Sequence, residues 1–214
     1  MDKLRIMSVF GTRPEAIKMC PLVKELASRP EIESLCCVTA QHRQMLDSVL
    51  EVFDLKPDMI LVHGDTSTTF AGALSAFYHQ VPVGHVEAGL RTYDKYSPFP
   101  EEMNRKMVSA IADLYFCPTV NNRENLVKEG ITKGLFVTGN TVIDALKTTV
   151  RKDYTFATEE LNHLPYGEKK VILVTCHRRE NYGEPMKHIM LALRQIAEQH
   201  EDVELVYPNR KSVV

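Results

Sequence analysis

Short apolar runs alternate with amphipathic stretches along most of the chain. Apolar runs of strand length lie at residues 4–10, 35–40, 59–64, 81–88, 114–119 and 135–140. Segments with apolar residues at helical spacing lie between them, at residues 14–27, 41–53, 66–80, 100–112 and 121–130. Strands that are apolar throughout and alternate with helices are typical of a parallel sheet covered on both faces. The pattern therefore predicts an α/β fold with a doubly wound, Rossmann-like parallel sheet over residues 1–150.

The alternation is interrupted after residue 150. Residues 151–169 are polar and predict an interdomain linker with a short helix. The pattern then resumes with a strand at 171–177, a helix at 185–199 and a strand at 203–208. Two strands and one helix cannot bury a core of their own. We therefore expect residues 170–214 to be the start of a second, incomplete Rossmann-like domain.

Distinctive polar sequences follow five of the six predicted strands of the first domain. They are GTRPE at 11–15, TAQHR at 39–43, HGDTST at 63–68, HVEAGLR at 85–91 and TGNT at 138–141. Ligands of doubly wound sheets bind at the carboxyl ends of the strands. The sequence therefore predicts a site along this one edge of the sheet.

The first of these turns has the character of an anion site. A glycine precedes a helix that has Pro14 in its first turn, and helix N-termini attract anions through their N–H groups and dipole. Arg13 and Lys18 add positive charge. The turn is neither a GxGxxG nor a Walker A sequence, which disfavours generic dinucleotide binding. The alternative is a plain strand–helix connection in which Arg13 pairs with Glu15.

Carboxylates follow two other predicted strands and begin one predicted helix. Asp65 ends the third strand and would be either a helix N-cap or a functional acid. Glu87 ends the fourth strand, has no evident structural task, and is followed by Arg91, a candidate for substrate binding. Glu101 and Glu102 begin a helix after a proline-containing loop, where the helix dipole favours acidic residues in any case.

One further group lies at the start of the second predicted domain. His177, Arg178 and Arg179 follow its first strand and would face the site from the opposite side, unless they form a solvated turn. Carboxylates, a histidine and arginines together suit proton transfers on an anionic, phosphate-bearing substrate. No spacing of histidines, cysteines and acids indicates a metal site, and no GxSxG indicates a serine nucleophile.

Composition narrows the class of protein. The net charge is −2 and no basic stretch is long enough to follow a nucleic acid backbone. No apolar run reaches the roughly 18 residues that span a membrane, and the N-terminus lacks the features of a signal peptide. The five cysteines are odd in number and show no CxxC spacing, so we expect reduced thiols in a cytoplasmic protein.

Eight longer motifs occur in a fixed order from about residue 3 to residue 208: FGTRPEAIKM, TAQHRQML, LVHGDTST, GHVEAGLRT, YSPFPEEMNR, TGNTVIDAL, HRRENYGEP and VYP. This set resembles the bacterial non-hydrolysing UDP-N-acetylglucosamine 2-epimerases. The resemblance implies a two-domain GT-B-like fold and a cytoplasmic homodimer without NAD, metal or other cofactor. It also implies an isomerase that interconverts UDP-N-acetylglucosamine and UDP-N-acetylmannosamine for cell-surface polysaccharides.

The family reaction is an anti-elimination of UDP to give 2-acetamidoglucal, followed by re-addition of UDP. By motif match, the catalytic residues are Asp65, Glu87, Glu101 and His177. Arg13, Lys18 and Arg178 match substrate-contacting positions. Some bacterial members bind a second, activating UDP-N-acetylglucosamine, and the matching positions are Gln41, Gln44 and Arg178.

The sequence departs from the family pattern in two places. The family has a further strand and most of a helix before the LVHGD strand, whereas residues 53–58 connect the two segments directly here. Most of the family's UDP-binding domain has no counterpart after Pro208, so we expect a truncated or compacted form of a longer protein. Two alternatives stay open: a hydrolysing epimerase that releases free N-acetylmannosamine, and a module that binds a nucleotide sugar without turnover.

Overall fold

The computed structural model describes residues 3–38, 57–176 and 181–208. The chain divides into two compact units, Met1–Val150 and Arg151–Val214, and each is described by itself below. The predicted helix at 41–53 lies outside the described residues.

The first unit is built on a single sheet of six parallel strands in the order β2-β1-β3-β4-β5-β6. The strands are β1 (Leu4–Phe10), β2 (Ile32–Val38), β3 (Met59–His63), β4 (Val83–Val86), β5 (Leu114–Cys117) and β6 (Leu135–Val137). The helices are α1 (Arg13–Ser28), α3 (Ser67–Tyr78), α4 (Glu101–Ile111), α5 (Val120–Lys128) and α6 (Thr141–Thr149). The α/β fold with a doubly wound parallel sheet is therefore confirmed.

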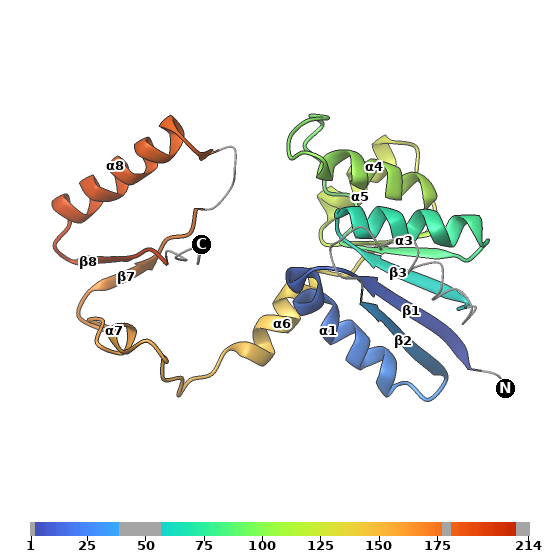
Figure 1. Cartoon of the computed structure of the whole chain (residues 1–214), viewed down its shortest axis with the longest axis horizontal. Coiled ribbons are helices and arrows are strands. Elements are labelled where there is room, and N and C mark those ends of the chain that lie inside the picture. Colours follow the sequence, from blue (N-terminus) through green and yellow to red (C-terminus); the bar gives the residue numbers. More distant parts are fainter. Residues whose placement is uncertain (1–2, 39–56, 177–180, 209–214) are drawn as a thin grey trace, which may run out of the picture. The chain divides into compact units, whose positions relative to one another are not determined.

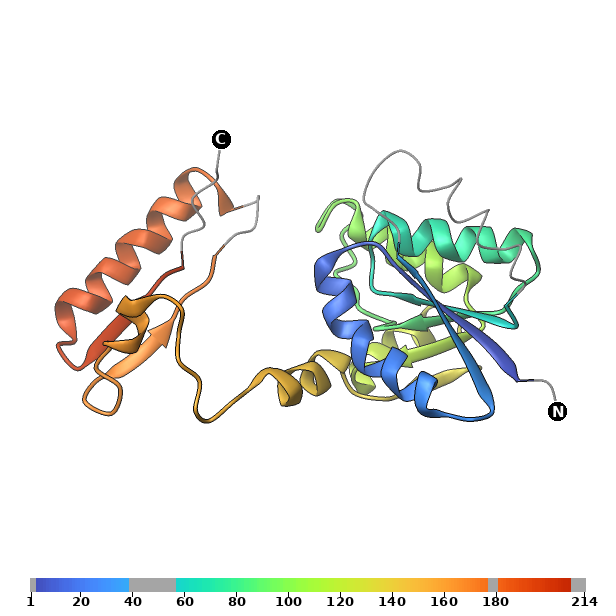
Figure 2. The same ribbon diagram turned by 60° about the horizontal axis from the view of Figure 1, so that its bottom comes forward.

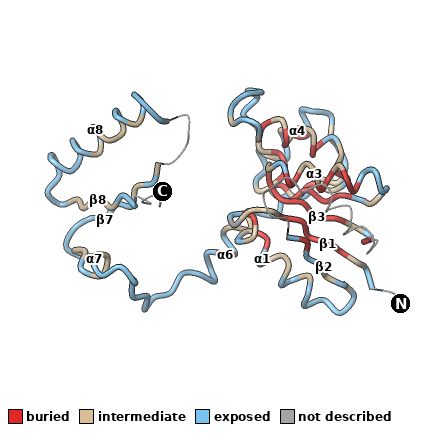
Figure 3. The backbone as a smooth tube through the Cα atoms, in the orientation of Figure 1, coloured by how far each residue is buried: buried red, intermediate tan, exposed pale blue. Residues whose placement is uncertain are grey.

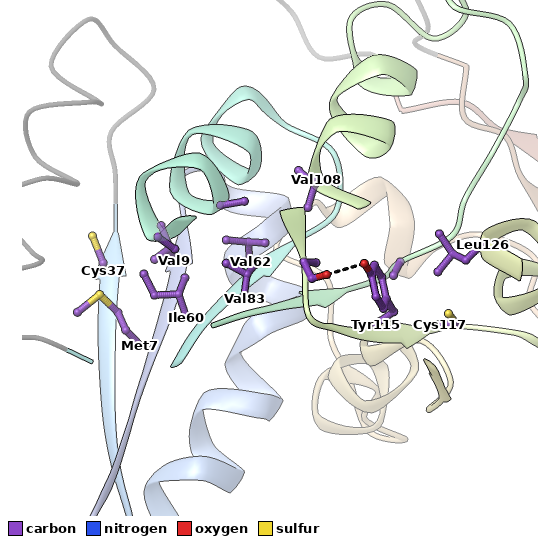
Figure 4. Packing of buried hydrophobic residues seen from close by; sticks show 14 residues of the cluster. Met7, Val9, Cys37, Ile60, Val62, Val83, Val108, Tyr115, Cys117 and Leu126 are labelled. Carbon is purple, nitrogen blue, oxygen red and sulfur yellow. Dashed lines mark hydrogen bonds between the residues drawn. The ribbon is translucent and has the colours of Figure 1, made fainter. Parts of the chain in front are cut away.

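Helices cover both faces of this sheet. Successive strand residues point to opposite faces, so each strand contributes side chains to a core on either side. Met7, Val9, Ile60 and Val62 face α3, α4 and α5 and form the larger core, shown in Figure 4. Ile6 and Leu61 belong to a smaller core under α1, on the face that α1 shares with α6. Figures 1 and 2 show the two layers of helices, and Figure 3 shows buried residues in the inner strands and along α3 and α4.

The chain reverses its direction of travel across the sheet at β1. This strand pairs with β2 on one side and with β3 on the other. Such a switch point opens a crevice between the two strand ends in a doubly wound sheet. The turns 11–15 and 63–68 flank it, so the fold brings these two candidate motifs together.

The ends of several elements follow from local chemistry. Thr12 and Glu15 form a capping box at the start of α1, and Thr66 caps α3. Strand β4 ends before Glu87, because Glu87 has φ 65°, a left-handed conformation that a strand cannot contain. Helix α6 was not predicted as a helix, and it follows β6 after the Asn140 cap.

The second unit contains α7 (Glu159–Asn162), β7 (Lys170–Leu173), α8 (Glu184–Gln199) and β8 (Val203–Val206). β7 and β8 form a two-stranded parallel sheet. None of the residues described in this unit is buried. This agrees with the expectation that two strands and one helix do not enclose a core. Within the described parts of the chain, no helix is long and apolar enough to cross a membrane.

Candidate functional site

The turn after β1 is filled by the carboxylate of its own Glu15. The Oε2 atom accepts hydrogen bonds from the backbone N–H groups of Gly11 and Thr12, at 2.8 Å each. The Oε1 atom accepts one from the Thr66 hydroxyl at 2.5 Å. These N–H groups are therefore not available to an external anion as the sequence suggested. Glu15 instead ties the turn after β1 to the turn after β3.

Glu87 lies at the carboxyl edge of the sheet and contacts side chains from three other elements. The Lys18 Nζ atom lies 2.8 Å from its Oε1 and 3.0 Å from its Oε2. Asn140 donates from Nδ2 to Oε1 at 3.1 Å. The Nε2 atom of His63 lies 3.7 Å from Oε2. Residues of α1, β3 and the α6 cap thus converge on one carboxylate whose side chain is 13% exposed.

The surroundings keep Glu87 ionised. Burial opposes the charged form, but the hydrogen bond from Lys18, the positive charge of Lys18 and the hydrogen bond from the Asn140 amide hold the pKa of Glu87 below its usual range. The amide orientation of Asn140 is fixed as well. Its Oδ1 accepts from the Val142 N–H at 3.0 Å, so its NH₂ group must face Glu87.

Asp65 is held by an arginine of α4. The Nε and Nη2 atoms of Arg105 lie 2.9 and 2.6 Å from its Oδ2, and Asn104 donates to its backbone carbonyl at 2.8 Å. Thr66 provides the N-cap of α3, so the helix-capping alternative for Asp65 is wrong. Asp65 is a charged group that links β3 to α4.

The neighbouring acids Glu101 and Glu102 have different surroundings. Glu102 is 0% exposed and accepts from the N–H groups of Thr92 and Tyr93 at 3.1 Å each and from Arg105 at 3.2 Å. Burial opposes its charge, but these donors hold the pKa of Glu102 below its usual range. The Oε2 atom of Glu101 is buried and has no hydrogen-bond partner in the described part of the chain.

Arg91 does not face the edge as a free cation. Its side chain is 0% exposed and pairs with Glu129 through Nε at 2.8 Å and Nη2 at 2.7 Å. It also donates to the Ser109 hydroxyl and to the Leu90 carbonyl. All of these partners are internal, so the structure disfavours the substrate-binding role expected for Arg91. The residue connects the turn after β4 to α4 and α5.

Several predicted site residues lie outside what the structure describes. These are His177, Arg178, Gln41 and Gln44, together with the side chain of Arg13. Their proposed roles therefore rest on the sequence motifs alone. In the described ranges, no three His, Cys, Asp or Glu side chains are placed to hold a metal ion.

The structure adds five residues that the sequence analysis did not assign to the site: Glu15, His63, Asn140, Arg105 and His85. Glu102 and Arg105 are three positions apart on a predicted helix, so their pairing had a sequence signal. His85 donates from Nε2 to the Gly64 carbonyl at 2.8 Å, which supports the turn before Asp65. Thr12 and Glu15 also have the spacing of a capping box, which is a local signal. The remaining contacts join segments far apart in sequence, for which local patterns give no signal.

Comparison with known proteins places the chain in a family. A profile of the UDP-N-acetylglucosamine 2-epimerase family matches residues 54–213. The Bacillus subtilis UDP-N-acetylglucosamine 2-epimerase is 54% identical over 242 residues, with 97% of this chain and 63% of the relative covered. The Salmonella typhimurium enzyme of the same name is 46% identical, with 96% and 65% covered. This chain thus spans 63–65% of the length of these curated relatives.

Solved structures agree. The Staphylococcus aureus MnaA–UDP co-structure has a TM-score of 0.88 and 47% identity, with 100% of this chain and 63% of that chain covered. The UDP-N-acetylglucosamine 2-epimerase of Neisseria meningitidis bound to UDP-N-acetylglucosamine has a TM-score of 0.83 and 41% identity, with 97% and 66% covered.

The alignment with the Bacillus relative runs over 242 residues, more than the 214 of this chain, so the relative has residues within the aligned region that are lacking here. The profile match and the identities are nevertheless extensive. The chain belongs to the UDP-N-acetylglucosamine 2-epimerase family.

Proposed function

We propose that the protein interconverts UDP-N-acetylglucosamine and UDP-N-acetylmannosamine by elimination and re-addition of UDP. The observation that carries this proposal is the set of acids at one sheet edge. Two of them, Glu87 and Asp65, are held by cations, and the third, Glu101, has a buried oxygen without a hydrogen-bond partner in the part of the chain that the structure describes. Family membership and the ligands named for the S. aureus and N. meningitidis structures support the same substrate class.

The proposed reaction requires several kinds of protein group. A base removes the C2 proton, the C1–O bond to UDP breaks with its electron pair, and a C1=C2 double bond forms. Re-addition of UDP and return of the proton to the other face complete the epimerisation. The developing positive charge on the ring needs fixed anions, the leaving diphosphate needs cations, and C2 needs a proton carrier.

We assign the described residues to these tasks by their surroundings. Glu87 and Asp65 are the anions that stabilise the developing positive charge, because each already forms an ion pair with a cation of the protein. Glu101 is the group best suited to exchange a proton. Lys18 is the cation for the diphosphate, for which an anionic substrate would compete with Glu87.

The motif match extends the proposal to residues outside the described ranges. His177 would be a catalytic residue, and Arg13 and Arg178 would contact the substrate. Gln41 and Gln44, with Arg178, would hold an activating second nucleotide sugar. A homodimer that works in the cytoplasm and supplies cell-surface polysaccharide synthesis completes the proposal.

A binding module without turnover is the second candidate. The observation that favours it is the second unit, in which none of the described residues is buried. A hydrolysing epimerase is a third outcome, which the sequence left open. All three share the substrate and differ in the product.

Proton NMR of the protein with UDP-N-acetylglucosamine in deuterated water separates these outcomes. Deuterium at C2 of a nucleotide sugar is the result expected for the proposed epimerase. Free N-acetylmannosamine would identify the hydrolysing enzyme. Binding of the substrate without any reaction would identify the module and would overturn the proposed epimerisation.

A further inference from the structure

We propose that His63 is a positioning residue for Glu87: a neutral imidazole whose Nε2–H holds the inner carboxylate oxygen, so that Glu87 acts as a fixed anion and not as a proton carrier. This inference rests on the proposed epimerase function, because it assigns Glu87 its part in that reaction.

The position of His63 is the first support. It is the last residue of β3, its side chain is 2% exposed, and its Nε2 atom lies 3.7 Å from Glu87 Oε2. Neither ring nitrogen has a hydrogen-bond partner among the described residues. A buried polar ring without a structural partner is costly. Glu87 is the group to which this ring can donate a hydrogen bond.

The two oxygens of Glu87 are held unequally. Oε1 has both Lys18, at 2.8 Å, and Asn140, at 3.1 Å. Oε2 has Lys18 at 3.0 Å and then His63 at the longer distance of 3.7 Å. If the diphosphate of a substrate draws Lys18 away, Asn140 remains on Oε1 and His63 becomes the donor for Oε2. The imidazole therefore matters most in the substrate complex.

The imidazole is neutral near pH 7. Burial lowers the pKa of His63 and Lys18 lowers it further, while three carboxylates act in the opposite direction without outweighing burial. The charged and titratable groups that act on His63 are Glu87, Lys18, Glu15, Asp65 and His85. A neutral ring with a carboxylate opposite Nε2 favours the tautomer with its proton on Nε2.

The test compares two variants at this position. His63→Leu removes the donor, and His63→Gln keeps an N–H on a side chain of similar reach. The matched control is His163→Gln, which removes an exposed histidine–glutamate pair of 3.0 Å with Glu159. Carbon-13 NMR follows the carboxyl groups through a pH titration, and the Glu87 signal is assigned by its loss in Glu87→Gln. The pH profile of turnover is measured in parallel.

We expect His63→Leu to raise the pKa of Glu87 by about one unit and to move the acidic limb of the rate profile by the same amount. His63→Gln should recover most of the shift, and His163→Gln should cause none. An unchanged Glu87 titration in folded His63→Leu would overturn the proposal. Because the titration needs no turnover, it decides the role of His63 even if the epimerase function fails.

A measurement on the unmodified protein tests the proposal even if the His63 variants do not fold. Nitrogen-15 NMR of labelled histidine at pH 7 reports the protonation of each ring nitrogen. A neutral His63 ring with the proton on Nε2 is the expected result. An imidazolium, or a proton on Nδ1 alone, would overturn the proposal.

Discussion

Glu101 and Glu102 are neighbours that begin the same helix, yet their carboxyl groups have different tasks. Glu102 receives three hydrogen bonds and fixes the loop after β4, because both Thr92 and Tyr93 donate their N–H groups to it. Glu101 has a buried oxygen without a partner in the described ranges. At the residue scale, hydrogen-bond satisfaction separates a structural acid from a candidate catalytic one.

This difference predicts unequal effects of the same substitution on stability. Glu102→Gln removes the charge that Arg105 and two backbone N–H groups face, and should lower the free energy of unfolding by about 2–3 kcal/mol. Glu101→Gln should change it by less than about 1 kcal/mol, because the lost carboxylate has few partners. Urea denaturation of the two variants measures both values. Equal stability losses would contradict the assignment.

The pairing of individual side chains is the part of the site that the sequence could not supply. Lys18 and Glu87 are 69 positions apart, and Asp65 and Arg105 are 40 apart. Both Asp65 and Glu87 were correctly placed at strand ends. Their partners depend on how α1 and α4 cross those ends, which the periodicity of each segment does not encode. The pairing of Arg91 with Glu129 was not predicted for the same reason, since Glu129 is the residue that follows α5.

At the scale of elements, the sequence predicted most of the first sheet. Apolar runs located β1 to β6 because parallel strands are buried on both faces. Helix α6 was not predicted, although the Asn140 side chain caps its first turn. Strand β4 was predicted four residues too long, at 81–88 instead of Val83–Val86, since the left-handed Glu87 ends it.

The close packing of the turn after β4 against α5 gives a prediction for an element. Gly89 has φ +84°, and a Cβ atom there would lie 2.1 Å from the Asn122 carbonyl oxygen. Gly89→Ala should therefore destabilise the fold by more than about 4 kcal/mol, because the backbone of α5 must move. Thermal unfolding measures the loss.

Gly139→Ala is the matched control for this substitution. Gly139 also has a positive φ, +80°, but nothing lies within 4 Å of an added Cβ atom. Gly139→Ala should lower the free energy of unfolding by only about 1–2 kcal/mol, because alanine is strained in the left-handed conformation. Similar losses in the two variants would show that α5 does not constrain the turn.

At the scale of the whole molecule, the histidines and carboxylates whose pKa values are lowered make stability depend on pH in one direction. Burial lowers the pKa of His85 from 6.5 to about 4, although its hydrogen bond to Gly64 opposes this. The pKa values of His63, Glu87 and Glu102 are lowered as well. In each case the unfolded chain binds a proton at a higher pH than the folded chain does. Stability is therefore lost as the pH falls.

We predict that the free energy of unfolding falls between pH 6.5 and pH 4 by up to about 3 kcal/mol through His85 alone. Urea denaturation at a series of pH values measures this slope. His85→Gln cannot titrate but keeps a donor for the Gly64 carbonyl, so its slope over this window should be shallower. A slope identical to that of the unmodified protein would exclude His85 as its source.

The proposed epimerisation requires Glu87 as an anion that stabilises the positive charge developing on the sugar ring. The most direct measurement is the rate of C2 deuterium exchange and the affinity for UDP-N-acetylglucosamine, compared between the protein and Glu87→Gln. We predict that the rate falls by at least about 100-fold while the dissociation constant changes only a few-fold, because the charge acts mainly in the transition state. An unchanged rate in Glu87→Gln, or no exchange by the unmodified protein, would contradict the account.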